Sequence, residues 1–586
     1  MTAIPVLTAE VAAHSDERLR PRGKASYVAG LTDEPLRFAT LSQVFDEAVA
    51  DFGSRPAAIF SSLRQVLTWS DLKRDSEQVA LSLMALGLQR GDKVGIWSPN
   101  RREWLSALFG AARIGVVLVS LDPACKLVEL EASLNKLECR ALIMVRSADG
   151  SDLMGMLRGL APELDRPAAK PLLEAQRLPH LKHVIVLDEG LVPACARRFS
   201  DFLRLGGASQ RRRLPAAVAS LDPDDAISIQ FTSGTTGPAK AVTLSHYSIV
   251  NNAHCSAQAL GLTEVDKLCI AVPLCQCIGL LQGVLACVSV GATMVFPAER
   301  FDALGTLDAV SRHRCTALHG VPAMFAAMLS HPDRRHYDTS CLRTGIIAGA
   351  KCHAEIITGV MEDFQMDQVT VAYGLAETGS LAFQSSVDDP LQRRVGTVGR
   401  IHSHLEAKII DGDGQIVPVG SQGQLCTRGY SVMRDYCEDA KRTREALDTN
   451  GWLHTGDLAT IDAEGYCRIL GRVGDSFLRG DEKVHPHEIE AIIERHPDVR
   501  AAQVFGVPDS ELGADICAWI VLEPGKALSP EEIVSFCRKH GARGRLPRHV
   551  RLVAEFPLTV NGKAKKHLMR AAMVRELAHH GVRRRA

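Results

Sequence analysis

The sequence lacks a net charge and lacks regions of extreme composition. Its 68 Lys and Arg residues balance 68 Asp and Glu residues, and its pI is near 7.3. This balance gives no global electrostatic attraction to nucleic acid or to an anionic membrane. Internal repeats and low-complexity tracts are also missing. We therefore expect no nucleic acid among its partners.

The sequence also lacks the signs of a disulfide scaffold, a leader peptide or a membrane span. Its 16 cysteines form no CxxC pair, which in a long chain predicts reduced, mostly buried thiols. The first 20 residues have no basic region followed by a long apolar core. The most apolar window, residues 279–296, is interrupted by Gln282 and three glycines, so we expect a buried helix followed by a strand. These features predict a cytoplasmic protein without a membrane span.

A length of 586 residues predicts two to four folding units, and 46% hydrophobic residues are typical of a globular protein. Short β-branched runs alternate with helical patterns such as residues 76–88, which end at a glycine. The strand candidates of the first set are residues 93–98, 116–121, 141–145 and 183–188. A second set follows between residues 226 and 374. Such alternation predicts two parallel α/β subdomains.

The sequence pattern changes from alternating strands and helices after about Val395. Residues 407–429 are rich in turns and alternate in polarity, which is typical of a small antiparallel barrel or sheet. From Asp475 onward a compact α+β pattern appears, including a helix that begins near Ser529. We predict an α/β protein. Its large N-terminal domain (residues 1–474) contains two parallel α/β subdomains and a small β-barrel-like subdomain, and a small α+β C-terminal domain (residues 475–586) follows.

The stretch FTSGTTGPAKAVTLSH, residues 231–246, has the composition of a phosphate-binding loop. A strand leads directly into small residues, whose backbone N–H groups can converge on an anion. Further hydroxyl donors and a positive charge come from Thr232, Ser233, Thr235, Thr236 and Lys240. It is not a Walker A loop, because alanine flanks Lys240 on both sides. For such a run alone, a flexible surface loop is the competing interpretation.

Four later segments favour the phosphate-binding interpretation over the flexible surface loop. They are VAYGLAETGS (371–380), GWLHTGDLA (451–459), GRVGDSFLRGDEKVHPHEIE (471–490) and FPLTVNGKAKKHLMR (556–570). Together and in this order, the five segments resemble the adenylate-forming superfamily, which includes the acyl-CoA synthetases. The resemblance covers nearly the whole chain, from about residue 27 to residue 570. Segments such as LNKLECRALI and EIEAIIERHPDV are most similar to the medium-chain acyl-CoA synthetase branch.

The resemblance implies a reaction in two steps. A carboxylate is joined to AMP with release of pyrophosphate, and the acyl group then passes to the thiol of coenzyme A. The implied cofactors are ATP or acyl-AMP, Mg²⁺ and coenzyme A, and the implied substrate is a small carboxylic acid or its acyl-adenylate. The first step depends on phosphate positioning and charge stabilisation more than on acid–base chemistry.

The resemblance also assigns residues. The nucleotide-binding set is Thr232, Ser233, Gly234, Thr235, Thr236, Gly237, Lys240, Gly349, Ala350, Lys351, Tyr373, Gly374, Asp457 and Arg472. In this set Tyr373 would stack on adenine, and Asp457 would accept both ribose hydroxyls. Glu377 would hold Mg²⁺, a cation that prefers oxygen ligands. The catalytic residues are Lys563, Glu377 and Thr232, with Lys563 bridging the substrate carboxylate and the α-phosphate.

Lys563 belongs to the C-terminal domain, so that domain must close to bring it to the phosphates. By resemblance, the C-terminal domain is mobile and rotates about a hinge at Asp475 after adenylation. The expected acyl pocket is formed by Gln276, Gly320, Ala348 and Ala376. Its small residues would leave room for a bulky or cyclic acid as readily as for a fatty chain.

Several positions depart from the family pattern. Pro238 is shifted by one residue in the phosphate loop, and Ala241 replaces a glycine. Ala376 stands where a threonine normally donates to the α-phosphate, and Gln276 stands where histidine is common. Gly474 replaces the usual lysine before the hinge. Loss of one hydrogen bond to a charged phosphate costs about 1.5–3 kcal/mol, or roughly ten- to a hundredfold in rate.

Three interpretations follow. The first is an acid–CoA ligase that carries out both steps, with adenylation impaired by the altered positions. The second is an enzyme that performs only the thioester step, so that a separate adenylating enzyme supplies its acyl-AMP. The third is a non-catalytic acyl- or nucleotide-binding homologue. A separate carrier protein could replace coenzyme A as acceptor, and a homodimer is one candidate assembly.

Overall fold

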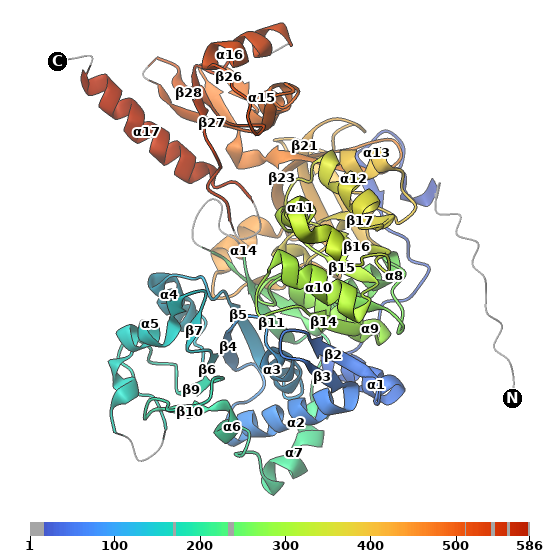
Figure 1. Ribbon diagram of the computed structural model, residues 1–586, viewed down its shortest axis with the longest axis vertical. Helices are drawn as coiled ribbons and strands as arrows, with labels where there is room; N and C mark the ends of the chain where they lie inside the picture. The colour runs from blue at the N-terminus through green and yellow to red at the C-terminus, as the bar shows by residue number, and fades with distance from the viewer. Residues whose placement is uncertain are drawn as a thin grey trace, which may run out of the picture.

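The structure is a computed structural model that describes residues 17–167, 171–232, 239–509, 511–540, 545–559 and 563–583. Figure 1 shows the chain passing from two stacked α/β layers, through a β-rich region, to a small C-terminal unit at the far end. Helix α17 extends outward from that unit (Figure 1). The predicted α/β class is confirmed.

The first sheet is parallel over most of its width. Its order is β10 (Ala196–Arg198), β9 (His183–Val186), β6 (Ala141–Met144), β4 (Lys93–Trp97), β5 (Val117–Leu121), β11 (Ala226–Phe231), β12 (Ala241–Ser245) and β22 (Asp435–Tyr436). Only the pairings of β12 with β11 and β22 are antiparallel. The central strands β4, β5 and β6 read as apolar runs because helices cover both faces.

The second sheet combines parallel central strands with antiparallel edges. Its order is β19 (Arg400–Ile401), β18 (Phe383–Gln384), β17 (Gln368–Tyr373), β16 (Thr344–Ile347), β15 (Ala317–His319), β13 (Lys267–Ile270), β14 (Thr293–Phe296), β2 (Pro56–Phe60) and β3 (Gln65–Thr68). Phe60 and Phe296 stack with ring centroids 4.9 Å apart where β2 joins β14. N-terminal residues thus complete a sheet built mainly from the middle of the chain.

The β subdomain is antiparallel throughout. It contains β1 (Tyr27–Ala29), β20 (Leu405–Ile410), β21 (Gly423–Gly429), β23 (Leu453–Ile461) and β24 (Cys467–Arg472), in that order. The C-terminal unit contains β27 (Val499–Asp509), β28 (Gly513–Leu522) and β29 (His549–Leu552). Two short hairpins are β7 (Ser147–Ala148) with β8 (Ser151–Asp152), and β25 (Phe477–Arg479) with β26 (Glu482–Val484).

Helices surround these sheets. The α-helices are α1 (Leu41–Phe52), α2 (Trp69–Ala85), α3 (Arg102–Ala112), α4 (Leu127–Lys136), α5 (Leu153–Leu160), α6 (Phe199–Phe202), α7 (Ala208–Ala219), α8 (His246–Ala259), α9 (Ala286–Val290), α10 (Ala303–His313), α11 (Pro322–Ser330), α12 (Ala354–Asp363), α13 (Leu391–Gly396), α14 (Ala440–Ala446), α15 (Pro486–Ile493), α16 (Pro530–Lys539) and α17 (Lys566–Arg583). Short 3₁₀ turns are η1 (Glu17–Leu19), η2 (Pro162–Asp165), η4 (Pro332–His336), η5 (Ala376–Thr378) and η6 (Val473–Asp475), and η3 (Ile278–Leu285) is a π-helix.

Local sequence explains several of these boundaries. Helix α2 begins seven residues before the predicted start, because Thr68 and Asp71 form a capping box. Helix α16 begins after Ser529, which forms a capping box with Glu532. The apolar window at 279–296 folds as a buried π-helix and α9 followed by β14, as expected.

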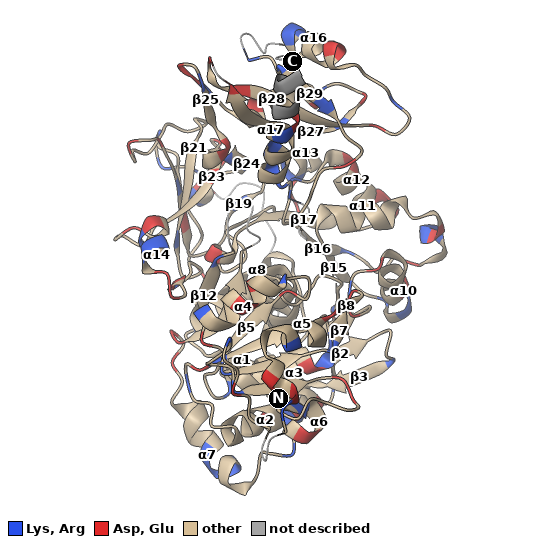
Figure 2. Cartoon of the chain, turned by 90° about the vertical axis from the view of Figure 1, so that its left-hand side faces the viewer, with Lys and Arg blue, Asp and Glu red and all other residues tan. Residues whose placement is uncertain are grey.

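The charges and thiols agree with the sequence predictions. Figure 2 shows basic and acidic residues interspersed over the view. All 16 cysteines lie in the part of the chain that the structure describes, and all are unpaired. Within the described ranges, no helix is long and apolar enough to cross a bilayer.

Candidate active site

A cavity of about 600 Å³ lies where the subdomains and the C-terminal unit meet. Its charged lining residues are Lys240, Glu377, Arg442, Glu445, Arg472, Asp475 and Lys563. Its apolar lining includes Phe231, Ile278, Val321, Leu375 and Leu381. The cavity lining therefore combines charged and apolar side chains.

The base of the phosphate loop lies in the cavity wall. Strands β11 and β12 form an antiparallel pair, and Thr232 and Lys240 follow and precede them. The Thr232 N–H donates to the Lys240 carbonyl at 3.0 Å, and the Lys240 N–H donates to Thr232 Oγ1 at 3.1 Å. The predicted residues Ser233, Gly234, Thr235, Thr236 and Gly237, with Pro238, lie outside the described residues. The two ends of the loop are thus held together at the cavity.

Lys240 and Glu377 are connected through Tyr436. The Tyr436 hydroxyl donates to Glu377 Oε1 at 2.7 Å and accepts from Lys240 Nζ at 3.2 Å. Burial, and then the charge of Glu377, raises the pKa of Tyr436 above its ordinary value. The phenol therefore stays protonated at neutral pH and acts as a donor to the carboxylate. Tyr436 is not among the residues predicted from the sequence.

Asp457 forms a second charged corner with Arg472 and Tyr373. Arg472 Nε lies 2.8 Å from Asp457 Oδ1, and the Tyr373 hydroxyl donates to Oδ2 at 2.5 Å. The two charged residues face each other across the β23–β24 pair. Burial raises the pKa of Asp457, and Arg472 opposes that shift. Asp457 and Tyr373 lie behind the cavity surface, whereas Arg472 lines it.

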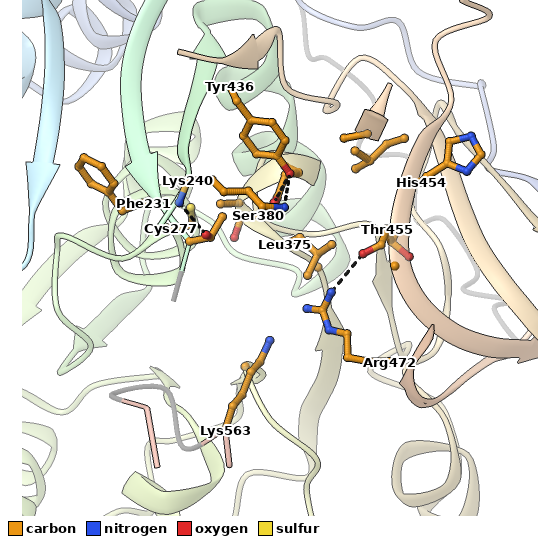
Figure 3. Close-up of a pocket in the computed structure, with 18 of the residues that line it drawn as sticks. Phe231, Lys240, Cys277, Leu375, Ser380, Tyr436, His454, Thr455, Arg472 and Lys563 are labelled. Atoms are coloured by element: carbon orange, nitrogen blue, oxygen red, sulfur yellow. Dashed lines mark hydrogen bonds between the residues drawn. The ribbon is translucent and has the colours of Figure 1, made fainter. Parts of the chain in front are cut away.

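Lys563 reaches this cavity from the C-terminal unit. In Figure 3 its ammonium group points toward the space bounded by Lys240, Tyr436 and Arg472. Its backbone is held by Thr559, whose N–H donates to the Lys563 carbonyl at 2.8 Å. Burial, followed by the charge of Arg472, lowers the pKa of Lys563, while Asp457 and Glu377 oppose the shift. The structure thus brings Lys563 to the same cavity as Glu377.

Contacts around Asp475 connect the predicted hinge to the C-terminal unit. Asp475 lines the cavity and lies 3.5 Å from Lys566 Nζ. Lys566 also donates to Glu490 Oε1 at 2.8 Å. A further contact joins Lys351, from the predicted nucleotide set, to Glu494 at 2.6 Å. The hinge role of Asp475 and the domain boundary there stay predictions.

The other predicted residues are divided between the cavity and its surroundings. Gln276, Ala348, Gly349, Gly374 and Ala376 line it. Gly320, Ala350 and Lys351 do not, and a side chain added at Gly320 would meet the Phe325 ring at 2.9 Å. The roles assigned to these residues by resemblance stay predictions. The lining residues Cys277, Arg442 and Glu445 were missed, because no motif marks them.

Gly374 is required by a close approach of two backbone segments. A Cβ atom at this position would lie 1.7 Å from the Ser380 carbonyl oxygen. We expect Gly374→Ala to lower the free energy of unfolding by about 1–3 kcal/mol, because the turn before Ser380 must open. Thermal denaturation would measure this loss. The matched control is Gly159→Ala in α5, where an added Cβ meets nothing within 4 Å, and a similar loss there would contradict the explanation.

Comparison with known proteins places this geometry in a family. The profile of the AMP-binding enzyme family matches residues 45–437, and the profile of the AMP-binding enzyme C-terminal domain matches residues 488–563. The chain belongs to the AMP-binding enzyme family. These matches confirm the adenylate-forming resemblance, and similarity to curated acyl-CoA synthetases confirms its acyl-CoA synthetase branch.

Relatives of this AMP-binding enzyme align over almost their whole length. "Putative acyl-CoA synthetase YngI" of Bacillus subtilis (strain 168) is 40% identical over 91% of this chain and 97% of its own. The mitochondrial medium-chain acyl-CoA ligase ACSF2 of Danio rerio is 36% identical over 95% of this chain and 92% of its own. Among solved structures, the anthranilate CoA ligase AuaEII in complex with anthranoyl-AMP has a TM-score of 0.78 at 24% identity, covering 93% of this chain and 99% of its own. This last likeness shows the fold alone.

Proposed function

We propose that this AMP-binding enzyme is an ATP- and Mg²⁺-dependent ligase that joins a hydrophobic carboxylic acid, fatty or bulky and cyclic, to coenzyme A. The observation that carries the proposal is the position of Lys563. It enters from the C-terminal unit into a cavity that also contains Glu377 and Arg472. The apolar lining residues, among them Phe231, Ile278 and Leu381, suit the acid's hydrocarbon part.

In the first step, a carboxylate oxygen of the acid attacks the α-phosphorus of ATP, and pyrophosphate leaves. Lys563 stabilises the negative charge that develops between the carboxylate and the phosphate, a contribution that is large in a buried site. Arg472 and Asp457 bind the ribose. In the second step, the CoA thiol loses its proton to solvent, its sulfur attacks the acyl carbon, and AMP leaves.

The residues present fit a role for Mg²⁺. Glu377 Oε1 accepts from Tyr436, and Oε2 accepts no hydrogen bond from any residue within the described ranges. In the same part of the chain, no cluster of three or more His, Cys, Asp or Glu side chains could hold a metal alone. One carboxylate beside a phosphate site is the arrangement that Mg²⁺ uses when phosphates and water complete its coordination. The ion would neutralise charge on the β- and γ-phosphates.

A second candidate function is the thioester step alone, from preformed acyl-AMP. The observation that favours it is Ala376, whose methyl group lines the cavity where the family pattern has a hydroxyl. In that case a separate enzyme must supply the acyl-adenylate. The retained Lys563 argues against this candidate and against a non-catalytic binder, because neither needs the lysine of the adenylation step.

Thioester formation from two substrate supplies distinguishes these candidates. One supply is the free acid with Mg·ATP and coenzyme A, and the other is the matching synthetic acyl-adenylate with coenzyme A. The acids should include fatty, aromatic and polycyclic members. We expect thioester from both supplies, with pyrophosphate released from the first. Product from the adenylate alone would establish the half-reaction instead, and replacing coenzyme A by a carrier protein would test the acceptor.

The unpaired state of all 16 cysteines supports a reducing compartment. We infer a cytoplasmic location on that basis. Detection of the enzyme in a fractionated cell would test the inference.

A further inference from the structure

The Tyr436 hydroxyl lies between two charged groups that face the cavity. It donates to Glu377 Oε1 at 2.7 Å and accepts from Lys240 Nζ at 3.2 Å (Figure 3 shows Lys240 beneath the ring). Lys240 Nζ also lies 4.8 Å from the centroid of the tyrosine ring. Both the ring face and the hydroxyl therefore attract the ammonium group. All three residues line the cavity.

The backbone fixes the position of this tyrosine. Tyr436 pairs with Val242 across β22 and β12, so it belongs to the same sheet that carries the phosphate loop. The next residue in the chain, Cys437, donates its N–H to the Ala241 carbonyl at 2.8 Å. The Tyr436 N–H donates to Thr443 Oγ1 at 3.0 Å. The hydroxyl thus has a fixed location relative to Lys240, which immediately precedes β12.

Glu377 is held at one oxygen only. Glu377 is 8% exposed, and its backbone carbonyl accepts from the Met433 N–H at 2.9 Å. The hydrogen bond from Tyr436 fixes the rotation of the carboxylate through Oε1. In the described part of the chain nothing donates to Oε2. A carboxylate oriented in this way presents one oxygen to a cation.

We propose that Tyr436 is a positioning residue for the adenylation step. Its hydroxyl holds Glu377 in the orientation that receives Mg²⁺, and it holds Lys240 where the phosphates of ATP arrive. One hydroxyl thereby fixes the relative positions of Glu377, which would bind the metal, and Lys240, which would bind the phosphates. This inference rests on the proposed function, because it concerns the nucleotide form that the first step consumes.

The test is Tyr436→Phe, which removes the hydroxyl and keeps the ring. Calorimetric titration should show the Kd for Mg·ATP rising by about ten- to a hundredfold, as expected when a hydrogen bond to a charged group is lost. The Kd for AMP should change by less than about twofold, because other residues, Asp457 and Arg472, are proposed to bind the ribose. Thioester formation from a preformed acyl-adenylate should also be retained. A purely structural role would not separate Mg·ATP from AMP.

The chain offers a matched control in Tyr466. Its hydroxyl donates to Asp389 Oδ1 at 2.6 Å, and Arg393 lies 4.4 Å from its ring centroid. Tyr466→Phe thus removes the same kind of tyrosine–carboxylate bond beside a cation, away from the cavity lining. We expect a lower melting temperature from this variant and an unchanged Kd for Mg·ATP.

Wild-type affinity for Mg·ATP in Tyr436→Phe would overturn the proposal, and so would equal losses for Mg·ATP and AMP. The binding measurement also separates this inference from the proposed function. If the wild-type enzyme binds Mg·ATP but forms no acyl-adenylate, the two-step reaction is wrong and the role of Tyr436 is still decided by the Kd values. If the wild-type enzyme binds no Mg·ATP, both are wrong.

Discussion

Replacement of Lys563 by alanine is expected to lower the rate of acyl-adenylate formation by about 10²–10³-fold. In the proposed mechanism the variant removes a positive charge from the point where the acid and the α-phosphate meet, and preorganised groups at such points have effects of this size. The cavity makes the effect large, because its walls limit the water that could replace the ammonium group. Thioester formation from a preformed acyl-adenylate should be retained, since that step follows the formation of the P–O bond.

Pyrophosphate release measures the first half-reaction, and thioester formation from synthetic acyl-AMP measures the second. The matched control is Lys565→Ala, two residues further along the chain and outside the cavity lining. This control should retain both activities. Equal loss of both half-reactions in Lys563→Ala would contradict the assigned role and would indicate that the lysine stabilises the C-terminal unit.

Replacement of Asp457 by alanine should damage both half-reactions. We expect kcat/KM to fall by about 10²–10⁴-fold in each, because both steps use the AMP moiety and two hydrogen bonds to a charged group would be lost. The carboxylate is only 5% exposed and holds both Arg472 and Tyr373. Its removal therefore also leaves a guanidinium group without its partner in the cavity wall.

Titration with AMP provides a direct readout for Asp457, since binding should weaken in parallel with turnover. Asp201→Ala is a suitable control, because Asp201 pairs with Arg198 at 2.6 Å on the surface and exposed pairs contribute little. Normal AMP affinity in Asp457→Ala would show that another residue binds the ribose. The contrast with Lys563 is informative, because one variant should affect a single step and the other both.

Much of the fold follows from local sequence patterns. Strands β4, β5, β6 and β9 lie within the predicted ranges, because short β-branched runs between helices leave few alternatives. Strand β1 was not predicted. Its pairing with β20 depends on residues far along the chain, which no local pattern encodes. The π-helical form of η3 was also missed, since an apolar run predicts a buried helix but not its hydrogen-bond period.

The candidate site could be predicted only as far as motifs identify it. Lys563, Arg472 and Glu377 stand in recognisable segments, and the structure brings all three to one cavity. Tyr436 was not predicted, because its contact with Glu377 depends on tertiary structure. The ion pair between Lys351 and Glu494 could likewise not be predicted from the sequence, since it joins two folding units.

The long-range pairing of β1 has a consequence for biosynthesis. Tyr27 and its hydrogen-bond partner Glu406 are 379 residues apart in the chain. At about 5–20 residues per second, the ribosome needs on the order of 20–80 seconds to deliver that partner. During this time the first strand has no sheet to join. The same sheet contains β23 and β24, which carry Asp457 and Arg472. The ribosome therefore delivers the strands that carry Asp457 and Arg472 after all strands of the first α/β sheet.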